Sequence, residues 1–251
     1  MDPVTILYED NHLLVAVKPV FMLSQADRSG KPDLLGYLSA MLKTRDNKPG
    51  NVFLGLVHRL DQPVGGVMIF AKTSKAAKRL AEQFRAKTVQ KHYLAVTHGA
   101  LPDGTLHWQD YLSEKTTNGR YTVTDAAHGR AADLLIRRLA HADDNRLSLA
   151  HVRLLTGRSH QIRLQCQSRG WPLVGDRRYG DETPLDLATP SIALFAHSLT
   201  VRHPVSKETL VFSAQPDTPI FRRFAPYLQA DVLRQSMERL AEAAVEHNNR
   251  L

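Results

Sequence analysis

Apolar and polar positions alternate along this chain in a way that is typical of strands joined by turns. Residues 6–8 and 13–17 are apolar runs on either side of a polar turn, and Pro19 ends the second run. This pattern predicts two short strands. Further runs of this kind predict strands near residues 67–71, 91–99, 108–112, 121–124, 132–139, 146–155, 193–201 and 209–214.

Other segments repeat their apolar residues every three or four positions, as a helix with one buried face does. Ala77, Leu80 and Phe84 have this spacing, and Thr73 or Ser74 can cap the helix that they predict. Three more helices are predicted, at residues 34–42, at 158–170 and, with a long amphipathic stripe, at 228–247.

Many strands, few helices and no regular strand–helix–strand alternation indicate an α+β fold. We expect a mixed, largely antiparallel β-sheet with flanking helices. No repeat or linker is evident, so the sequence predicts one domain over residues 1–225. The amphipathic helix at 226–251 is an extension for which the sequence suggests no role.

Composition narrows the class of protein. The 251 residues are 43% hydrophobic, which supports a sizeable core. A single cysteine, Cys166, excludes an intramolecular disulfide and favours a reducing compartment. The N-terminus has no signal-peptide pattern, and no apolar run approaches the roughly 20 residues that a membrane span needs. We therefore expect a cytoplasmic protein, with no membrane association and most simply a monomer.

Basic residues are concentrated in two stretches. Lys plus Arg number 33 against 25 acids, a net charge of +8, which favours a polyanionic partner or serves only solubility. Residues 72–91 carry seven basic side chains against Glu82, and residues 151–180 carry six arginines against Asp176. The two stretches are candidates to line one phosphate-binding cleft, although the first is also compatible with a solvated helix face.

Several familiar sites are missing from the sequence. There is no glycine-rich phosphate loop, no Gly-x-Ser-x-Gly elbow and no kinase signature set. The twelve histidines never occur at a His-Glu-x-x-His spacing, so no catalytic metal is expected. Cys166 lies on a predicted helix, where a buried structural thiol is the simplest interpretation.

Asp61 is the first candidate for chemistry. It lies in "VHRLDQPVGG", directly before a predicted strand. An aspartate there is ordinarily a turn former or a cap. Arg59, if turned towards it, would keep the carboxylate ionised, and the glycines at 65 and 66 would let another backbone approach closely.

The second candidate is the arginine-rich stretch at residues 154–180. Arg158, His160, Gln161 and Arg163 follow a strand that ends at Thr156-Gly157. A helix that begins there would offer free N–H groups to an anion. The alternative is a surface helix with ordinary polar side chains.

Four segments together carry a resemblance to a known family. "HRLDQPVGGVMIFAKT", "KHYLAV", "TGRSHQIRLQ" and "PLVGDRRYG" occur in this order and resemble the motifs of the RluA-type pseudouridine synthases. The likeness covers roughly residues 5–215. It differs from the family pattern at Val64-Gly65-Gly66 and at Arg163-Leu164-Gln165, and it includes no N-terminal RNA-binding domain of the S4 type.

The resemblance implies an RNA isomerase that converts selected uridines of ribosomal or transfer RNA to pseudouridine without cofactor or metal. Asp61 matches the catalytic carboxylate, Tyr93 the residue that stacks on the flipped base, and Arg163 the cation paired with Asp61. A central RNA-binding cleft is implied, and the RNA itself is the expected partner. The candidate RNA-binding residues are His58, Arg59, Lys75, Lys78, Arg79, Arg158, His160 and Gln161.

Two other functions are considered. A non-catalytic RNA-binding relative would use the same basic groove, but it would not need Asp61, Tyr93 and Arg163 together. A nucleoside or glycoside hydrolase should carry a second catalytic carboxylate, and no motif of the chain supplies one.

Overall fold

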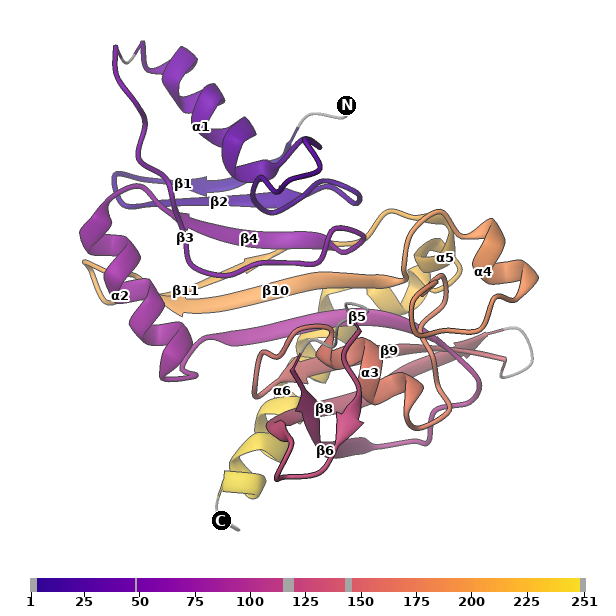
Figure 1. Cartoon of the computed structure of the whole chain (residues 1–251). Coiled ribbons are helices and arrows are strands. Elements are labelled where there is room, and N and C mark those ends of the chain that lie inside the picture. The colour runs from indigo at the N-terminus through magenta and orange to yellow at the C-terminus, as the bar shows by residue number, and fades with distance from the viewer. Residues whose placement is uncertain (1–3, 48, 115–119, 143–145, 249–251) are drawn as a thin grey trace. The chain divides into compact units, whose positions relative to one another are not determined.

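The computed structural model describes residues 4–47, 49–114, 120–142 and 146–248 (Figure 1). Two compact units make up the chain. The first unit takes Met1–Gln90 and Ala196–Ala214, and the second unit takes Lys91–Phe195 and Gln215–Leu251. Residues 226–248, the described part of the predicted extension, belong to the second unit. Residues 249–251 lie outside the described part.

The first unit is built on a sheet whose strands follow the order β1, β2, β4 and β10. β2 pairs antiparallel with both β1 and β4, and its register with β4 runs from Leu13 opposite Ala71 to Lys18 opposite Gly66. β3 pairs with β4, and β11 pairs with β10. The strands are β1 (Ile6–Glu9), β2 (Leu13–Lys18), β3 (Gly55–Leu56), β4 (Gly65–Ala71), β10 (Leu194–Arg202) and β11 (Thr209–Ser213).

Every residue of β4 is buried, because both faces of this central strand are covered. Alternate residues of β2 and β4 pack against α2 (Ser74–Arg85), whose Ala76 and Leu80 belong to the same core cluster. The Thr73 hydroxyl caps α2 by accepting from Ala76 N, as predicted. α1 (Leu34–Arg45) begins in the same way, with the Asp33 carboxylate accepting from Gly36 N.

The second unit has its own antiparallel strands, in the order β5, β9, β8, β6 and β7. They are β5 (Gln90–His98), β9 (Leu147–Leu154), β8 (Gly129–Ala142), β6 (Thr105–Ser113) and β7 (Val123–Thr124). A bulge interrupts the β8–β9 register between Arg138 and Ala140. The helices of this unit are α3 (Gln161–Gln167), α4 (Pro184–Ala188), α5 (Pro219–Arg222), the 3₁₀ turn η1 (Ala225–Leu228) and α6 (Ala230–Asn248).

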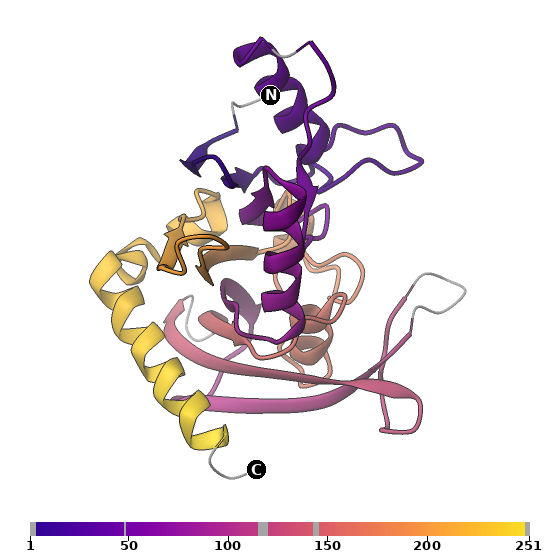
Figure 2. The same cartoon turned by 90° about the vertical axis from the view of Figure 1, so that its left-hand side faces the viewer.

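The predicted amphipathic helix is α6, which runs beside the strands of the second unit (Figure 2). Its Leu240 and Ala244 pack on Leu135 of β8. Near the middle of the helix, Ser236 Oγ hydrogen-bonds the buried His151 Nδ1 at 2.9 Å. α6 is therefore fastened to the sheet by an apolar stripe and a polar contact.

The fold class expected from the sequence, α+β with a largely antiparallel sheet, is confirmed. α3 begins later than predicted, at Gln161, because His160 takes a left-handed conformation with φ 55°. α4 and α5 were not predicted, since each spans only about one turn. Over the described ranges, none of the helices combines the length and the apolar character that crossing a membrane would require.

Candidate functional site

Asp61 lies in a loop that joins β3 to β4 within the first unit. The loop turns tightly, since Val64 N donates to Asp61 O at 3.0 Å. On its other side, Ser24 Oγ donates to Leu60 O at 2.7 Å and accepts from Leu60 N at 3.0 Å. The backbone next to Asp61 is thus fixed at two points, while the Asp61 residue is partly exposed.

A buried lysine lies beneath this loop. The Lys18 side chain has no exposed surface, and its ammonium donates to the carbonyls of Met22, Gln62 and Pro19 at 2.6, 3.1 and 3.0 Å. Burial lowers the pKa of Lys18 to about 7, and the negative charge of Asp61 acts in the opposite direction. Lys18 therefore ties the end of β2 to the Asp61 loop and contributes a positive charge to the carboxylate's surroundings.

The neighbours of Asp61 divide into structural and exposed residues. His58 Nε2 accepts from Ile69 N at 3.0 Å, and its ring stacks on Phe84 with centroids 4.9 Å apart. Arg59 is exposed. Gly66 has a φ of 127°, and a side chain there would collide with the backbone of Ala196, so the close approach predicted at the two glycines is confirmed for Gly66.

Tyr93 lies on β5 of the second unit, opposite Val152 of β9. Its side chain is half-buried, whereas its neighbours His92 and Leu94 are buried. This alternation is the one that a strand imposes on successive side chains. The Tyr93 side chain is thus partly accessible, although Ala95 and Thr97 on the same face of β5 are buried.

Arg163 is enclosed in the second unit, 6% exposed, and paired with Asp176, which is 3% exposed. Arg163 Nε and Nη2 donate to the two oxygens of Asp176 at 2.8 and 2.7 Å. Asp176 also accepts from the backbone N–H groups of Arg178 and Tyr179. The guanidinium lies 5.0 Å from the centroid of the Tyr179 ring. The segment "GDRRYG" therefore wraps around Arg163 and fixes it.

His160 and Gln161 hold the segment that leads to Arg163. His160 Nδ1 is 2.7 Å from the Tyr179 hydroxyl. Gln161 is 2% exposed, and its Oε1 accepts from Arg158 N and Thr156 Oγ1 at 3.0 and 2.8 Å. The N–H group of Arg158, expected from the sequence to be available to an anion, is thus taken by a side chain.

Arg158 lines an open cavity of about 350 Å³. Its Nε donates to Ala131 O at 2.9 Å, and Arg130 and Glu114, which are paired with each other, line the same cavity. In the first unit, Lys75 and Lys78 of α2 are exposed. Arg79 donates through Nη1 to Pro204 O at 2.8 Å, so it helps to hold this helix.

In the first unit, Lys18 holds the loop that carries Asp61. In the second unit, Asp176 and Tyr179 contact Arg163, and His160 contacts Tyr179. The sequence did not identify Lys18, Asp176 or Tyr179 as site residues. Asp176 carried a signal, because it is the one acid of the arginine-rich stretch. The sequence signal for Lys18 was weak, because it consists only of the position of this lysine at the end of an apolar run.

Cys166 is free and buried, as predicted. Burial raises the pKa of its thiol to about 12, so the sulfur stays protonated at neutral pH and is a poor nucleophile.

The chain is similar to known enzymes. The sequence pattern of the RNA pseudouridylate synthase family matches residues 12–168. The dual-specificity RNA pseudouridine synthase RluA of Haemophilus influenzae is 34% identical over 214 residues, which cover 84% of this chain and 93% of that protein. The ribosomal large subunit pseudouridine synthase D of Xanthomonas campestris is 35% identical over 262 residues, covering 96% and 73%.

The fold is similar to that of a solved structure, human RNA pseudouridylate synthase domain containing 1. The TM-score is 0.72 over 94% of this chain and 95% of that one, at 22% identity. At this level of identity the likeness concerns the fold.

Fold and sequence together therefore define an RNA-modifying isomerase. The chain belongs to the RNA pseudouridylate synthase family, and the resemblance seen in its motifs is confirmed.

The burial of Lys18 predicts an unusual titration. Between about pH 7 and the ordinary lysine value of 10.5, the unfolded chain holds a proton that folded Lys18 has released. The free energy of unfolding should therefore rise with pH across this window. NMR titration of the Lys18 side-chain carbon next to the ammonium should give a midpoint near 7. The midpoint should fall further in Asp61→Asn, because the opposing charge is lost. A midpoint that is unchanged or higher in that variant would contradict the coupling.

The Arg163–Asp176 pair predicts a large effect on stability. Asp176→Asn should lower the free energy of unfolding by about 3–5 kcal/mol, because it removes the buried negative charge that accepts two hydrogen bonds from the enclosed guanidinium. The matched control is Asp217→Asn. Asp217 pairs with Arg222 at the same 2.7 Å, but both side chains are exposed, so urea denaturation should detect little change. Equal losses in the two variants would show that burial does not set the strength of the pair.

Proposed function

We propose that this chain isomerises specific uridines of ribosomal or transfer RNA, with Asp61 as the catalytic carboxylate. One observation supports this role above the others: the Asp61 loop is fixed by Ser24 and by the enclosed Lys18, while the Asp61 residue remains partly exposed. A turn that only reversed the chain would not need a buried lysine to hold its backbone at Gln62. The relatives are named for ribosomal large subunit RNA or for dual specificity, which supports this choice of substrate.

The reaction is an internal rearrangement. The bond between uracil N1 and ribose C1′ breaks, the base turns, and C5 bonds to C1′. The hydrogen on C5 leaves as a proton and N1 gains one, so neither oxidant nor reductant is consumed. Asp61 serves as nucleophile or base, Tyr93 stacks on the flipped uracil, and Arg163 keeps Asp61 ionised.

The proposed RNA-binding residues act in two ways. Exposed Arg59, Lys75 and Lys78 are free to approach phosphates, and Arg158 can do so from the cavity that it lines. A second group is already engaged with the protein, and we propose that it holds the surfaces from which the first group acts. That group comprises His58, Arg79, His160 and Gln161.

Asp61→Asn should abolish pseudouridine formation, because the amide can neither attack nor accept a proton. Cells that lack the protein would be complemented with wild type, Asp61→Asn or Asp27→Asn, and pseudouridines would be mapped across ribosomal and transfer RNA. Asp27 is an exposed aspartate of the same unit whose partner is its neighbour Ser29, so its variant should restore every site. The sites that only the active variants restore identify the substrate.

Two results of this experiment would decide against the proposal. Restoration by Asp61→Asn would remove the carboxylate from the mechanism. Binding of RNA by the purified wild type, with no release of tritium from RNA labelled at uracil C5, would favour the non-catalytic RNA-binding relative.

The exposed lysines of α2 predict a salt effect. Neutralising Lys75 and Lys78 to Gln should lower the slope of log affinity against log salt by about 2, one unit for each phosphate that a lysine no longer neutralises. The control is Lys31→Gln with Lys43→Gln, which removes the same charge from exposed positions elsewhere in the first unit. Filter binding at several salt concentrations measures both slopes. A control slope that falls as much as the α2 slope would return α2 to a merely solvated face.

A further inference from the structure

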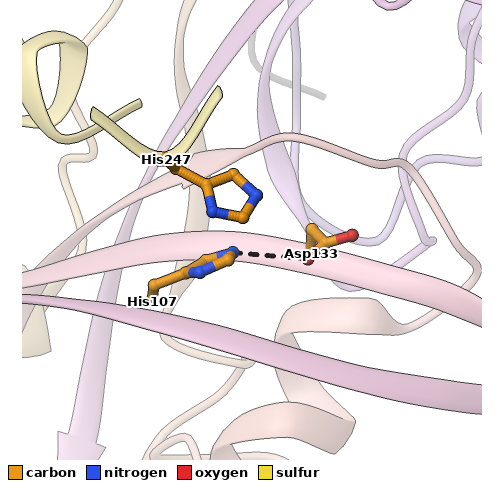
Figure 3. A group of neighbouring side chains, drawn as sticks. All are labelled: His107, Asp133 and His247. Atoms are coloured by element: carbon orange, nitrogen blue, oxygen red, sulfur yellow. Dashed lines mark ion pairs between the residues drawn. The ribbon is translucent and has the colours of Figure 1, made fainter. Parts of the chain in front are cut away.

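Three side chains of the second unit converge at the C-terminal end of α6. They are His107 of β6, Asp133 of β8 and His247 in the last turn of α6 (Figure 3). One nitrogen or oxygen atom from each lies within 4.8 Å of the others. His107 Nε2 is 3.3 Å from Asp133 Oδ1, and the two imidazole centroids are 4.0 Å apart.

The fold explains why these residues meet. His107 lies opposite Leu135, and Asp133 lies opposite Gln109, two residues along the same β6–β8 ladder. His107 and Asp133 are therefore diagonal neighbours on the sheet face that carries Leu135. Leu240 and Ala244 pack on Leu135, and His247 follows Ala244 by three positions on the same helical stripe.

His107 Nε2 and Asp133 Oδ1 face each other at 3.3 Å but are not joined by a hydrogen bond. Both atoms are covered from solvent, and within the described part of the chain neither makes a hydrogen bond. Buried polar atoms without partners are costly, and each such pair requires an explanation. Neutral imidazole nitrogens and a carboxylate are metal ligands.

We propose that His107, Asp133 and His247 form a binding site for a divalent transition-metal ion of the zinc class, which fastens the end of α6 to β6 and β8. Two nitrogens and one carboxylate oxygen suit zinc and its neighbours better than magnesium. Tetrahedral zinc holds its ligand atoms about 3.3 Å apart. His107 Nε2 and Asp133 Oδ1 already have this spacing. The His247 nitrogen lies within 4.8 Å of both atoms, so it needs only a small shift at the end of α6 to reach the same spacing.

The experiment measures zinc binding to the purified full chain by competition with a chromogenic chelator. Wild type should bind one zinc per chain at micromolar zinc and should not bind magnesium. His247→Gln should weaken zinc binding by at least about 100-fold, because it removes a direct ligand. Cobalt should give the absorption of a tetrahedral site in wild type and not in the variant.

The control is His128→Gln. His128 is an exposed histidine of the same unit that pairs only with its neighbour Asp125 among the described residues, so its variant should bind zinc as the wild type does. Zinc should raise the melting temperature of the wild type and of His128→Gln but not of His247→Gln. If His247→Gln alters the melting temperature in the absence of metal, His107→Gln serves as a second ligand variant. The same loss of zinc binding is expected for it. Equal zinc affinity in wild type and both ligand variants, or no stoichiometric zinc in the wild type, would overturn the site.

Discussion

An ammonium group without access to water fixes the part of this chain on which catalysis is proposed to depend. The Lys18 amine donates to three backbone carbonyls, those of Pro19 directly after β2, of Met22 and of Gln62 in the Asp61 loop. Removing a charge from water costs several kcal/mol unless such partners replace the solvent. The contacts of Lys18 therefore set the path of the loop, and the loop sets the position of Asp61.

The second unit also buries a positive charge, and there the partner is a carboxylate: Arg163 is paired with Asp176. A planar guanidinium suits a carboxylate bidentately, and Arg163 and Asp176 use that geometry. Two backbone N–H groups, of Arg178 and Tyr179, also donate to Asp176 Oδ1. An enclosed ion pair is weak evidence for stability, since an apolar pair can do as well. What the pair does provide is a guanidinium held in one fixed position.

Much of the fold was predictable because it rests on local periodicity. The apolar stripe of α2 and its Thr73 cap, the alternation in β5 and the stripe of α6 are each visible within about twenty residues. The start of α3 was not, because it depends on a left-handed His160 and on the Gln161 side chain that captures Arg158 N. Asp61 was singled out by its motif and its role stays a prediction, whereas Lys18 reads as an ordinary surface lysine until the carbonyl of Gln62 is placed against it.

The proposed metal site of His107, Asp133 and His247 likewise depends on contacts that form only in the folded chain and not on a local sequence pattern. Metal sites are recognised in sequences when their ligands share one helix or one loop, so that the spacing is regular. His107, Asp133 and His247 are separated by 26 and 114 positions, and no spacing rule connects them. They are connected by a strand register and by a helical stripe whose other members are apolar. The same apolar contacts that dock α6 therefore bring the three donors together, which gives this helix a function that its sequence pattern does not show.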